Sequence, residues 1–448
     1  MDSALTEIAA VRPFHVTNRL VLSIAVPMML AYASTPLLGI VDTTVVGQFG
    51  SAALLGGLAA GAAIFDVVFN TFNFLRAGTT GLTAQAFGRG DPGGEQAAFW
   101  HAISIAVVAG ILLILLAPLV AFVGGWFMNA GVAVTAAMTL YIRIRMLSAP
   151  MALINYSVLG YVLGRGQAGL GLFLQILLNG TNMALCILLG LKLGWGVAGI
   201  AWATVCGETC AAVVGVSIVL IRFRRLPPLP RHRLFDRNAF LRMLTLNRDI
   251  MIRSFSLLGA FALFTRQSAQ LGTDVLAANA VLMNFFLIGS FFLDGFATAA
   301  EQLTGRAIGS RYEPAFRRAV SLTMLWGFAL AGVVTAFFLI FGDSLINLIS
   351  TGADVRLDAK AFLPWGAFTA VTGVLAFQMD GVFIGATWSR DMRNMMLLSF
   401  AIYIASLVPL SRLFGNTGVW IALHVFLVVR GLSLLAVLPA RKRAIFGN

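Results

Sequence analysis

The sequence has 448 residues, of which 59% are apolar and only 11% are charged, and its mean hydropathy is +0.90. Runs of about 20 apolar residues recur along it, a length that crosses the roughly 30 Å hydrocarbon layer of a bilayer. This composition excludes a soluble globular protein and predicts an all-α polytopic membrane protein. The segment before residue 20 is polar and the first apolar run is too long for a signal-peptide core, so we expect an inserted and not a secreted chain.

Twelve transmembrane helices are predicted, six on each side of a basic, proline-rich stretch. Those of the first half are expected at 20–48, 53–81, 97–124, 133–163, 169–191 and 195–221. Those of the second half are expected at 249–271, 275–304, 318–341, 361–385, 395–410 and 417–439. The chain therefore divides into an N-terminal six-helix lobe (1–221), a linker (222–248) and a C-terminal six-helix lobe (249–448).

The formal net charge of +13 follows the predicted topology. Most Lys and Arg residues fall on the side of the two termini, and the opposite side holds only Lys192, Arg356, Lys360 and Arg412. Because basic residues favour cytoplasmic loops, both termini and the linker are expected in the cytoplasm. The basic residues lie in separate short loops and not on one soluble face, so we expect no nucleic-acid partner. Attraction to an anionic leaflet is expected instead.

The first predicted span carries Asp42 in an otherwise apolar run. A charge in hydrocarbon costs several kcal/mol, so an intramembrane carboxylate faces a cavity or a partner and is a candidate functional group. The alternative is a structural Asp that is hydrogen-bonded to a neighbouring helix. Pro27 and Pro36 lie in the same span and predict that this helix is bent.

Polar side chains in spans 2, 4, 5 and 6 fall on single helix faces, and with Asp42 they are expected to line a polar pocket in the N-terminal lobe. The alternative for any one of them is an interhelical hydrogen bond worth under about 1 kcal/mol. In chain order these residues are Asp66, Asn70, Asn73, Arg145, Ser148, Asn155, Gln175, Asn179, Asn182, Thr204 and Glu208.

The second half carries fewer such residues. Asp294 and Glu301 share a face of span 8, and Asp380 lies toward the end of span 10. Arg430 and His424 lie within span 12. We expect some of these acids and arginines to form static ion pairs. We interpret His424 as a hydrogen-bonded packing residue, with a proton relay as the alternative.

The two halves contain matching motifs. The segment 83–89 after span 2 aligns with 300–306 after span 8, and 160–164 aligns with 381–385. Six spans in the same direction in each half predict two pseudo-symmetric bundles, related by an axis along the membrane normal, with a cavity between them. This architecture is typical of transporters.

No motif for a cofactor or for catalysis is found in the sequence. The three cysteines, Cys186, Cys206 and Cys210, are interpreted as small apolar residues with free thiols, and we expect no disulfide and no metal site. There is no P-loop, no His-Glu-x-x-His and no Gly-x-Ser-x-Gly motif. The sequence thus predicts no enzyme, and energy would come from an ion gradient or a partner subunit.

Four motifs carry a resemblance to a known family: the segments 39–47, 75–88, 147–150 and 380–394. They resemble the multidrug and toxic compound extrusion (MATE) family, and within it the DNA-damage-inducible protein F (DinF) branch. The resemblance covers essentially the whole chain. It implies twelve helices in two six-helix lobes around a V-shaped cavity. It also implies antiport, in which alternating access exports amphipathic, often cationic drugs against inward proton or sodium flow.

By position in that family, the resemblance implies that the proton and the substrate bind at Asp42, Asn155, Asn179 and Thr204. The second tier of candidates comprises Asp66, Asn70, Asn73, Arg145, Asn182, Glu208, Asp294 and Asp380. Some relatives carry a further acid four residues after the fifth-helix Asn, where this chain has Met183. Unless Asp66 or Glu208 replaces that acid, we expect proton and not sodium coupling.

The resemblance further implies a monomer in a bacterial cytoplasmic (inner) membrane, with lipids and small drugs as its partners. Two alternatives remain open. A lipid-linked-precursor flippase of the same superfamily would need a strongly basic central cavity, whereas the spans here balance acids with arginines. An integral membrane enzyme would need a nucleophile or a metal constellation that the sequence does not show.

Overall fold

The structure is a computed structural model that describes residues 11–129 and 131–447. Every regular element among these residues is helical. The elements of the first half are α1 (Asn18–Ala33), α2 (Thr35–Gly47), α3 (Ala52–Asn70), η1 (Thr71–Asn73), α4 (Phe74–Arg89), α5 (Pro92–Met128), α6 (Val132–Met146), α7 (Ala149–Gly164), α8 (Ala168–Leu185), η2 (Cys186–Lys192) and α9 (Gly196–Phe223). The elements of the second half are α10 (Arg231–Leu234), α11 (Arg237–Gln270), α12 (Thr273–Gly309), α13 (Glu313–Ile349), α14 (Ala353–Gly385) and α15 (Ser389–Phe446).

These helices make twelve membrane crossings in the described part of the chain, as predicted. Nine segments are long and apolar enough to cross a membrane, and α6 with α7 forms a tenth crossing that is bent by 54°. Helix α15 contributes two crossings, because Gly415 breaks its helical geometry and Arg441 near its end pairs with Asp391 near its start at 2.5 Å. Helix α11 is the twelfth, and its polar first turns lower its hydropathy.

Two predicted boundaries are corrected by the structure. Helix α11 begins at Arg237 and not near residue 249, because Asp236 caps it by accepting hydrogen bonds from the backbone N–H groups of Asn238 and Ala239. The last twelve residues of the expected linker are therefore helical. The fourth span is not one helix over 133–163, since α6 ends at Met146 and α7 begins with Pro150 in its first turn. Proline supplies no N–H for a helix that continues through it.

The first span is interrupted at Ser34, between α1 and α2. Pro36 lies in the first turn of α2 and Pro27 lies inside α1. Ser34 keeps right-handed helical backbone angles and α1 with α2 forms one 30-residue span, so the bend of this span stays a prediction. The two parts have different main neighbours. Helix α1 packs mainly on α12 of the second half and also on α8 of the first, whereas α2 packs on α3, η2, α8 and α9, all of the first.

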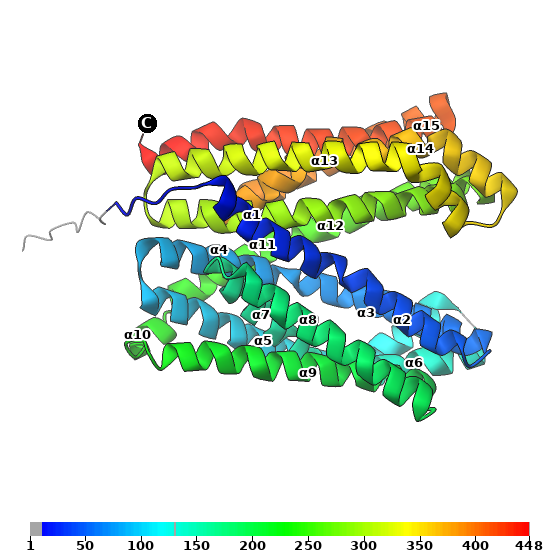
Figure 1. The fold of residues 1–448 in the computed structure, drawn as a ribbon, viewed down its shortest axis with the longest axis horizontal. Coiled ribbons are helices and arrows are strands. Elements are labelled where there is room, and N and C mark those ends of the chain that lie inside the picture. The colour runs from blue at the N-terminus through cyan, green and yellow to red at the C-terminus, as the bar shows by residue number, and fades with distance from the viewer. Residues whose placement is uncertain (1–10, 130, 448) are drawn as a thin grey trace, which may run out of the picture.

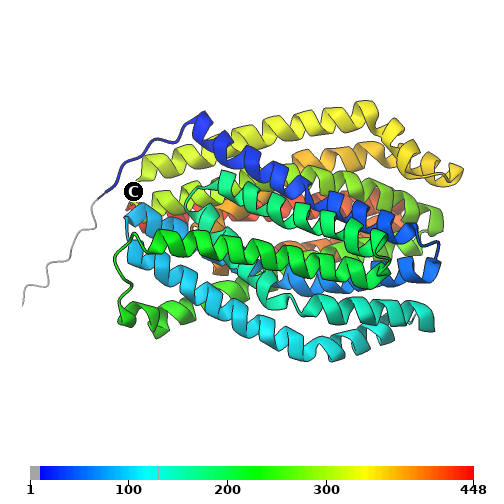
Figure 2. The ribbon, with the colours of Figure 1, turned by 60° about the horizontal axis from the view of Figure 1, so that its bottom comes forward.

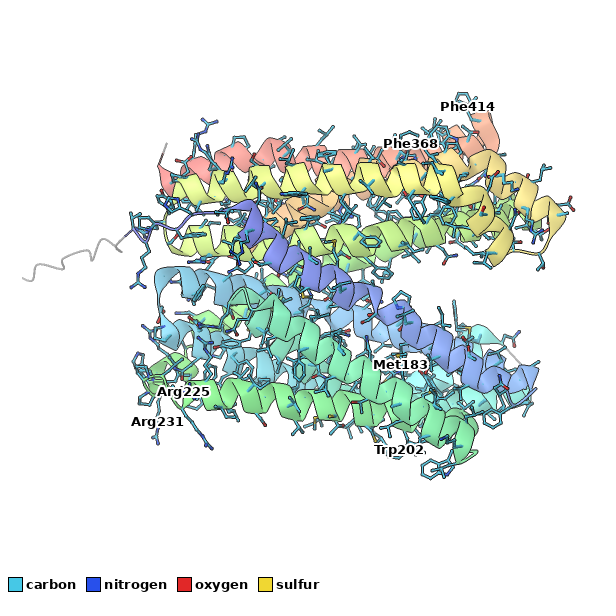
Figure 3. The ribbon with its side chains drawn as sticks, in the orientation of Figure 1. Met183, Trp202, Arg225, Arg231, Phe368 and Phe414 are labelled. Atoms are coloured by element: carbon cyan, nitrogen blue, oxygen red, sulfur yellow. The ribbon has the colours of Figure 1, made fainter. Side chains whose placement is uncertain are left out.

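The helices form two groups that run side by side along the long axis (Figures 1 and 2). Helices α12 to α15 lie in the upper group of Figure 1, α3, α5, α6, α8 and α9 lie in the lower group, and α1 with α2 crosses obliquely from the upper to the lower. The chain at residue 11, α10 and the end of α15 lie at one end of the molecule, which we call the terminal face. Large apolar side chains such as Trp202, Phe368 and Phe414 are exposed on the outside (Figure 3), as expected for surfaces that face lipid.

Glycines let helices of the first half approach closely. A Cβ atom added to Gly160 of α7 would lie 2.5 Å from the carbonyl oxygen of Arg76 on α4, and one added to Gly164 would lie 2.7 Å from that of Thr80. Small residues four apart allow two membrane helices to pack backbone against backbone. Residues 160–164 are one of the two repeated motifs that the sequence showed, and here the motif joins α7 to α4.

The matching motif makes the same kind of contact in the second half. Gly381 and Gly385 of α14 pack against the backbone of α12, where a Cβ atom on Gly385 would lie 2.6 Å from Oγ1 of Thr304. The contacted residues of α12 are Ala297, Glu301 and Thr304, and the last two belong to segment 300–306, which aligns with segment 83–89 of α4. The internal repeat is therefore visible as two equivalent glycine-mediated helix pairs.

The tightness of this packing predicts the effect of a small substitution. Gly160→Ala should lower the free energy of unfolding by about 1 to 3 kcal/mol, because the backbone of α4 cannot move away without separating two crossings. The measurement is thermal unfolding of the purified protein in detergent.

The matched control is Gly180→Ala in α8, where an added Cβ atom meets no atom within 4 Å. That substitution should leave stability unchanged or raise it by up to about 1 kcal/mol through helix propensity. Equal effects of the two variants would contradict the packing argument.

Candidate functional site

A cavity of about 350 Å³ lies inside the first half, enclosed by side chains of α2, α3, α6, α7, α8 and α9. Eight of the residues singled out in the sequence line it, so these polar side chains do meet at one cavity. These residues are Asp42, Asp66, Asn70, Arg145, Asn155, Gln175, Asn179 and Glu208. They come from five different crossings, which explains why spacing along one helix could suggest them only as separate stripes.

Asp42 lies in the second half of α2 with 9% of its surface exposed. Its Oδ1 accepts a hydrogen bond from Sγ of Cys186 at 3.3 Å. Cys186 was expected to be a small apolar packing residue, so this contact was not predicted. A signal was available, because Cys186 follows Asn179 by seven residues and so continues the polar face of the fifth span.

Asn179 connects α8 to the break in the first span. Its Nδ2 donates to Oγ of Ser34 at 2.8 Å, and the same hydroxyl donates to the carbonyl oxygen of Ala31 at 2.7 Å. Ser34 is the residue between α1 and α2. The amide of Asn179 thus binds the residue that separates α1 from α2, the helix that carries Asp42.

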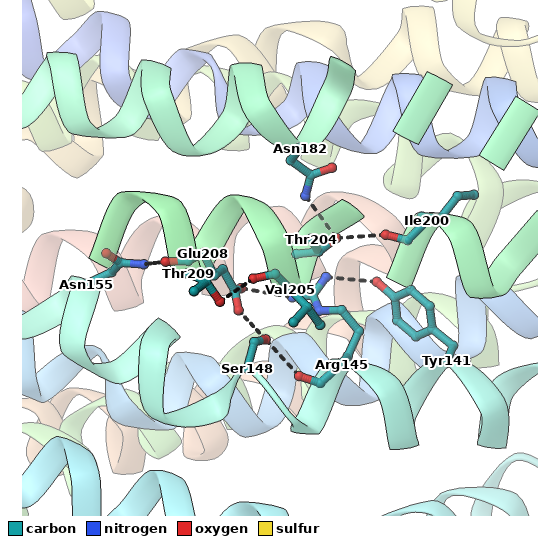
Figure 4. Close-up of polar contacts among 10 residues, drawn as sticks. All are labelled: Tyr141, Arg145, Ser148, Asn155, Asn182, Ile200, Thr204, Val205, Glu208 and Thr209. Atoms are coloured by element: carbon teal, nitrogen blue, oxygen red, sulfur yellow. Dashed lines mark hydrogen bonds and ion pairs between the residues drawn. The ribbon is translucent and has the colours of Figure 1, made fainter. Parts of the chain in front are cut away.

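Arg145 and Glu208 form the charged centre of this half (Figure 4). Nη2 of Arg145 lies 3.4 Å from Oε1 of Glu208, and Nη1 donates to the hydroxyl of Tyr141 at 3.0 Å. The guanidinium also lies 3.6 Å from the centre of the Phe65 ring, and Oγ of Ser148 donates to the other carboxylate oxygen of Glu208. Both oxygens of Glu208 therefore have a partner, which is the arrangement of a static ion pair.

Asn155, Asn182 and Thr204 are held by hydrogen bonds between helices. Nδ2 of Asn155 donates to the backbone oxygen of Glu208 at 2.9 Å, so the side chain of Asn155 joins α7 to α9 at the wall of the cavity. Nδ2 of Asn182 donates to Oγ1 of Thr204 at 2.9 Å. Asn182 and Thr204 are both buried and lie behind the cavity wall and not in it. Asn182 and Thr204 therefore form an interhelical hydrogen bond and do not line the pocket.

A second cavity, of about 540 Å³, lies between the two halves. Three arginines line it and each is paired with an acid. Arg76 of α4 lies 3.4 Å from Glu301 of α12, and it also donates to Asn73 at 3.2 Å. Asp380 of α14 pairs with Arg253 of α11 at 2.7 Å and with Arg430 of α15. The expected static ion pairs of the second half are confirmed, and the first of them bridges the halves.

Asp294 of α12 lines the same cavity beside Phe261, Phe286 and Phe377. Within residues 11–129 and 131–447, no side chain donates a hydrogen bond to its carboxylate. His424 is different: Nδ1 bonds with Oγ1 of Thr372 at 2.9 Å and Nε2 with the carbonyl oxygen of Trp365 at 3.1 Å. With both ring nitrogens occupied, the interpretation of His424 as a packing residue is confirmed.

The two halves close against each other toward the terminal face. Nε2 of Gln85 on α4 donates to the carbonyl oxygen of Gly385 at 3.0 Å and to Oγ1 of Thr387 at 3.1 Å. A shared cluster of buried apolar residues surrounds this contact and includes Leu75 of α4 and Leu303 of α12. The cavity between the halves is therefore sealed from the terminal face by packed helices.

Comparison with known proteins gives consistent matches over this architecture. The MatE family profile matches residues 27–188 and 250–409. The chain is 36% identical over 422 residues to DNA damage-inducible protein F of Escherichia coli (strain K12), which covers 92% of this chain and 90% of that protein. It is 26% identical over 442 residues to the probable multidrug resistance protein NorM of Rhizobium meliloti (strain 1021), covering 93% of this chain and 91% of that protein.

Solved structures share the fold at lower identity. A multidrug resistance MATE family transporter of the MOP superfamily in an outward-facing conformation superposes with a TM-score of 0.87 at 18% identity, covering 96% of this chain and 97% of that one. A MATE structure in a straight conformation superposes with a TM-score of 0.88 at 17% identity and the same coverage. At these identities the likeness concerns the fold alone.

The Arg145–Glu208 contact predicts a stability effect that depends on both partners. Glu208→Gln should lower the free energy of unfolding by about 3 kcal/mol, because it leaves a buried guanidinium without its carboxylate. Thermal unfolding in detergent measures the loss.

The double variant Arg145→Met/Glu208→Met provides the control. It removes both charges, so it should recover most of the stability lost in the single variant. Losses that simply add in the double variant would show that the two side chains are not energetically coupled.

Proposed function

Because the chain belongs to the MATE family of multidrug efflux transporters, we propose that it is a proton-coupled antiporter that exports amphipathic, often cationic compounds by alternating access. The family consists of transporters and not of enzymes. The observation that carries the proposal is the position of Asp42. It is a buried carboxylate on the wall of a cavity large enough for a small molecule, on a helix that is interrupted eight residues earlier.

Asp42 is the group we propose to take up and release the proton. An ionised carboxylate attracts a cationic compound in the cavity, and a neutral carboxyl does not. A ligand shifts a conformational equilibrium only through its different affinities for the two states, so protonation has to weaken drug binding for exchange to occur. One proton that enters with the membrane potential supplies about 2.3 kcal/mol per 100 mV.

The contacts of Asp42 support a proton more than a sodium ion. Among the described residues, the hydrogen bond to its carboxylate comes from a thiol, which is a weak donor. A hard cation is held instead by several oxygen ligands. The residue at 183, where some relatives carry an acid, is Met and supplies no oxygen. Glu208, which was a possible substitute, has both carboxylate oxygens bound by Arg145 and Ser148.

The predicted bend in the first span provides a means of coupling. Helix α2 carries Asp42, and the residue before α2, Ser34, is bound by Asn179. We propose that loss of charge at Asp42 lets α2 move relative to α1 at this break and changes the shape of the cavity. The lobes proposed at 1–221 and 249–448 would then rock about the cavity between them, opening and closing the contacts near Gln85.

The charge balance of the cavity between the halves argues against the flippase alternative. A lipid-linked pyrophosphate needs an excess of basic side chains to bind it. The three arginines that line this cavity are each paired with Glu301 or Asp380. The basic character required of such a site is therefore already neutralised.

Asp42→Asn should abolish both gradient-driven export and the pH dependence of drug binding. In the wild-type protein, the affinity for a cationic fluorescent drug should fall as the solution becomes acidic and the Asp42 carboxyl becomes neutral. The amide preserves the shape of the side chain and removes its titration. Binding titrations of purified protein from about pH 5 to about pH 9, with transport in proteoliposomes under an imposed pH gradient, measure the two effects.

The control is Asp66→Asn, which changes an exposed carboxylate on the same cavity. This variant should keep the pH dependence, even if its drug affinity changes. A pH dependence that persists in Asp42→Asn would refute the assignment and move the proton site to Asp380 or Asp66.

We also propose that the terminal face is cytoplasmic, as the distribution of basic residues predicts. Arg231→Cys places a thiol on α10, where the native side chain is exposed and points away from the body of the protein (Figure 3). With the native cysteines replaced by Ser, a membrane-impermeant maleimide should label this thiol in lysed cells and leave it unlabelled in intact ones. Labelling of intact cells would reverse the topology.

A further inference from the structure

A third cavity, of about 850 Å³, lies at the terminal face and does not include Asp42. It is bounded by the end of α4, the first turns of α5, the short helix α10 and the first turns of α11. Three arginines from three of these helices line the cavity: Arg89 of α4, Arg233 of α10 and Arg242 of α11. The cavity therefore collects basic side chains from segments far apart in the sequence.

The carboxylates at this cavity are already engaged. Asp91 accepts hydrogen bonds from the backbone N–H of Gly94 at 3.0 Å and from Nη1 of Arg233 at 2.6 Å. Asp236 accepts from the backbone N–H groups of Asn238 and Ala239 at 2.8 and 3.1 Å. The hydrogen bond from the backbone N–H of Ala239 is the main cause that holds the pKa of the Asp236 carboxyl below its ordinary value. Both acids thus act as charged caps of helices α5 and α11.

Of the three arginines at the cavity, Arg233 is paired with Asp91, and Arg89 and Arg242 remain. Within residues 11–129 and 131–447, neither forms a hydrogen bond or an ion pair with another side chain, although Arg242 acts on Asp236 and Arg89 on Asp91 through space. Both line the cavity and both are exposed in it. Two unpaired guanidiniums on facing elements are suited to a phosphate group, which accepts the parallel hydrogen bonds that arginine donates.

An aromatic groove of about 540 Å³ adjoins this cavity and shares His101 and Asp236 with it. Trp100 of α5 and Phe240 of α11 line it, and so does Phe235, which is 78% exposed. The groove is built on the linker itself, because Nε2 of His101 bonds with the carbonyl oxygen of Leu234 at 2.8 Å. Tryptophan is enriched at the boundary between headgroups and hydrocarbon, and an exposed Phe there favours contact with an acyl chain.

We propose that the cavity and the groove together bind one anionic phospholipid, with its phosphate between Arg89 and Arg242 and an acyl chain along Trp100 and Phe235. A phosphate site explains the two unpaired arginines. The adjoining apolar groove explains why the ligand is a lipid and not a soluble phosphate, since a small anion would leave the aromatic surface uncovered. Basic pockets beside transmembrane helices on the cytoplasmic side are recognised by acidic headgroups through the same chemistry.

The proposed lipid would touch both halves of the molecule. Arg89 ends α4 of the first half, and Arg242 lies in α11 of the second. A ligand bound to both stabilises the arrangement in which the terminal face is closed. The site is independent of Asp42, so it stands whether or not the proton assignment is correct.

Lipid binding to the purified, delipidated full chain in detergent tests this proposal, with native mass spectrometry as the readout. Phosphatidylglycerol should bind more tightly than phosphatidylcholine, which carries no net charge. The double variant Arg89→Gln/Arg242→Gln should bind phosphatidylglycerol about 30-fold more weakly, at about 1 kcal/mol per guanidinium. Phe235→Ser should also weaken phosphatidylglycerol binding, because it removes contact with the acyl chain.

The matched control is Arg225→Gln/Arg231→Gln, which removes the same charge from the same region. These two side chains point outward in Figure 3, and neither lines the cavity or the groove. The control should bind phosphatidylglycerol as the wild-type protein does, and all variants should show wild-type thermal unfolding without added lipid.

Three outcomes would overturn the proposal. An equal loss of phosphatidylglycerol binding in the control variant would show that binding depends only on the net positive charge of the terminal face. Equal binding of phosphatidylcholine would remove the role of the phosphate anion. Displacement of phosphatidylglycerol by glycerol 3-phosphate or inorganic phosphate at similar concentrations would indicate a site for a soluble anion.

Discussion

The need to pair or hydrate every charge inside the hydrocarbon layer organises this protein. Arg145 meets Glu208 inside the first half, Arg76 meets Glu301 across the two halves, and Arg253 and Arg430 both meet Asp380 inside the second. Each pair fixes the rotation of the helices that carry it, because a buried charge without a partner costs several kcal/mol. The helices around the two membrane-embedded cavities are therefore oriented by their charges as much as by their apolar faces.

The sequence predicted well those features that depend on residues within a single helix. The number of crossings follows from apolar runs, and the polar stripe that contains Asn155 or Asn179 follows from the period of the α-helix. The contacts that could not be predicted are those between helices. Asn182 binds Thr204 on the next crossing and Cys186 binds Asp42 on the first. Spacing can place Asn182 and Cys186 on a helix face, but it does not show which residue of another helix each one meets. The start of α11 was misplaced for a related reason, since hydropathy detects where a helix enters lipid and not where it begins.

The glycine contacts set a scaffold that is the same in both halves, and the charges make the halves different. Residues 160–164 and 381–385 place α7 on α4 and α14 on α12 in equivalent ways. On this common frame, the first half holds Asp42 beside a thiol, whereas the second half holds Asp380 between two arginines. The repeat thus supplies a shape, and the individual side chains decide what each half can do.

This difference bears on where a transport cycle can change its charge. A carboxylate that gains and loses a proton has to do so without leaving a buried arginine uncompensated. Asp380 and Glu208 are committed to guanidiniums, so neutralising either would expose an unpaired charge to an apolar interior. Asp42 accepts only the weak hydrogen bond of Cys186 among the described residues, and its helix is interrupted at Ser34. In the proposed cycle its charge would change at a smaller cost to its surroundings, and α2 would respond by moving relative to α1 at Ser34.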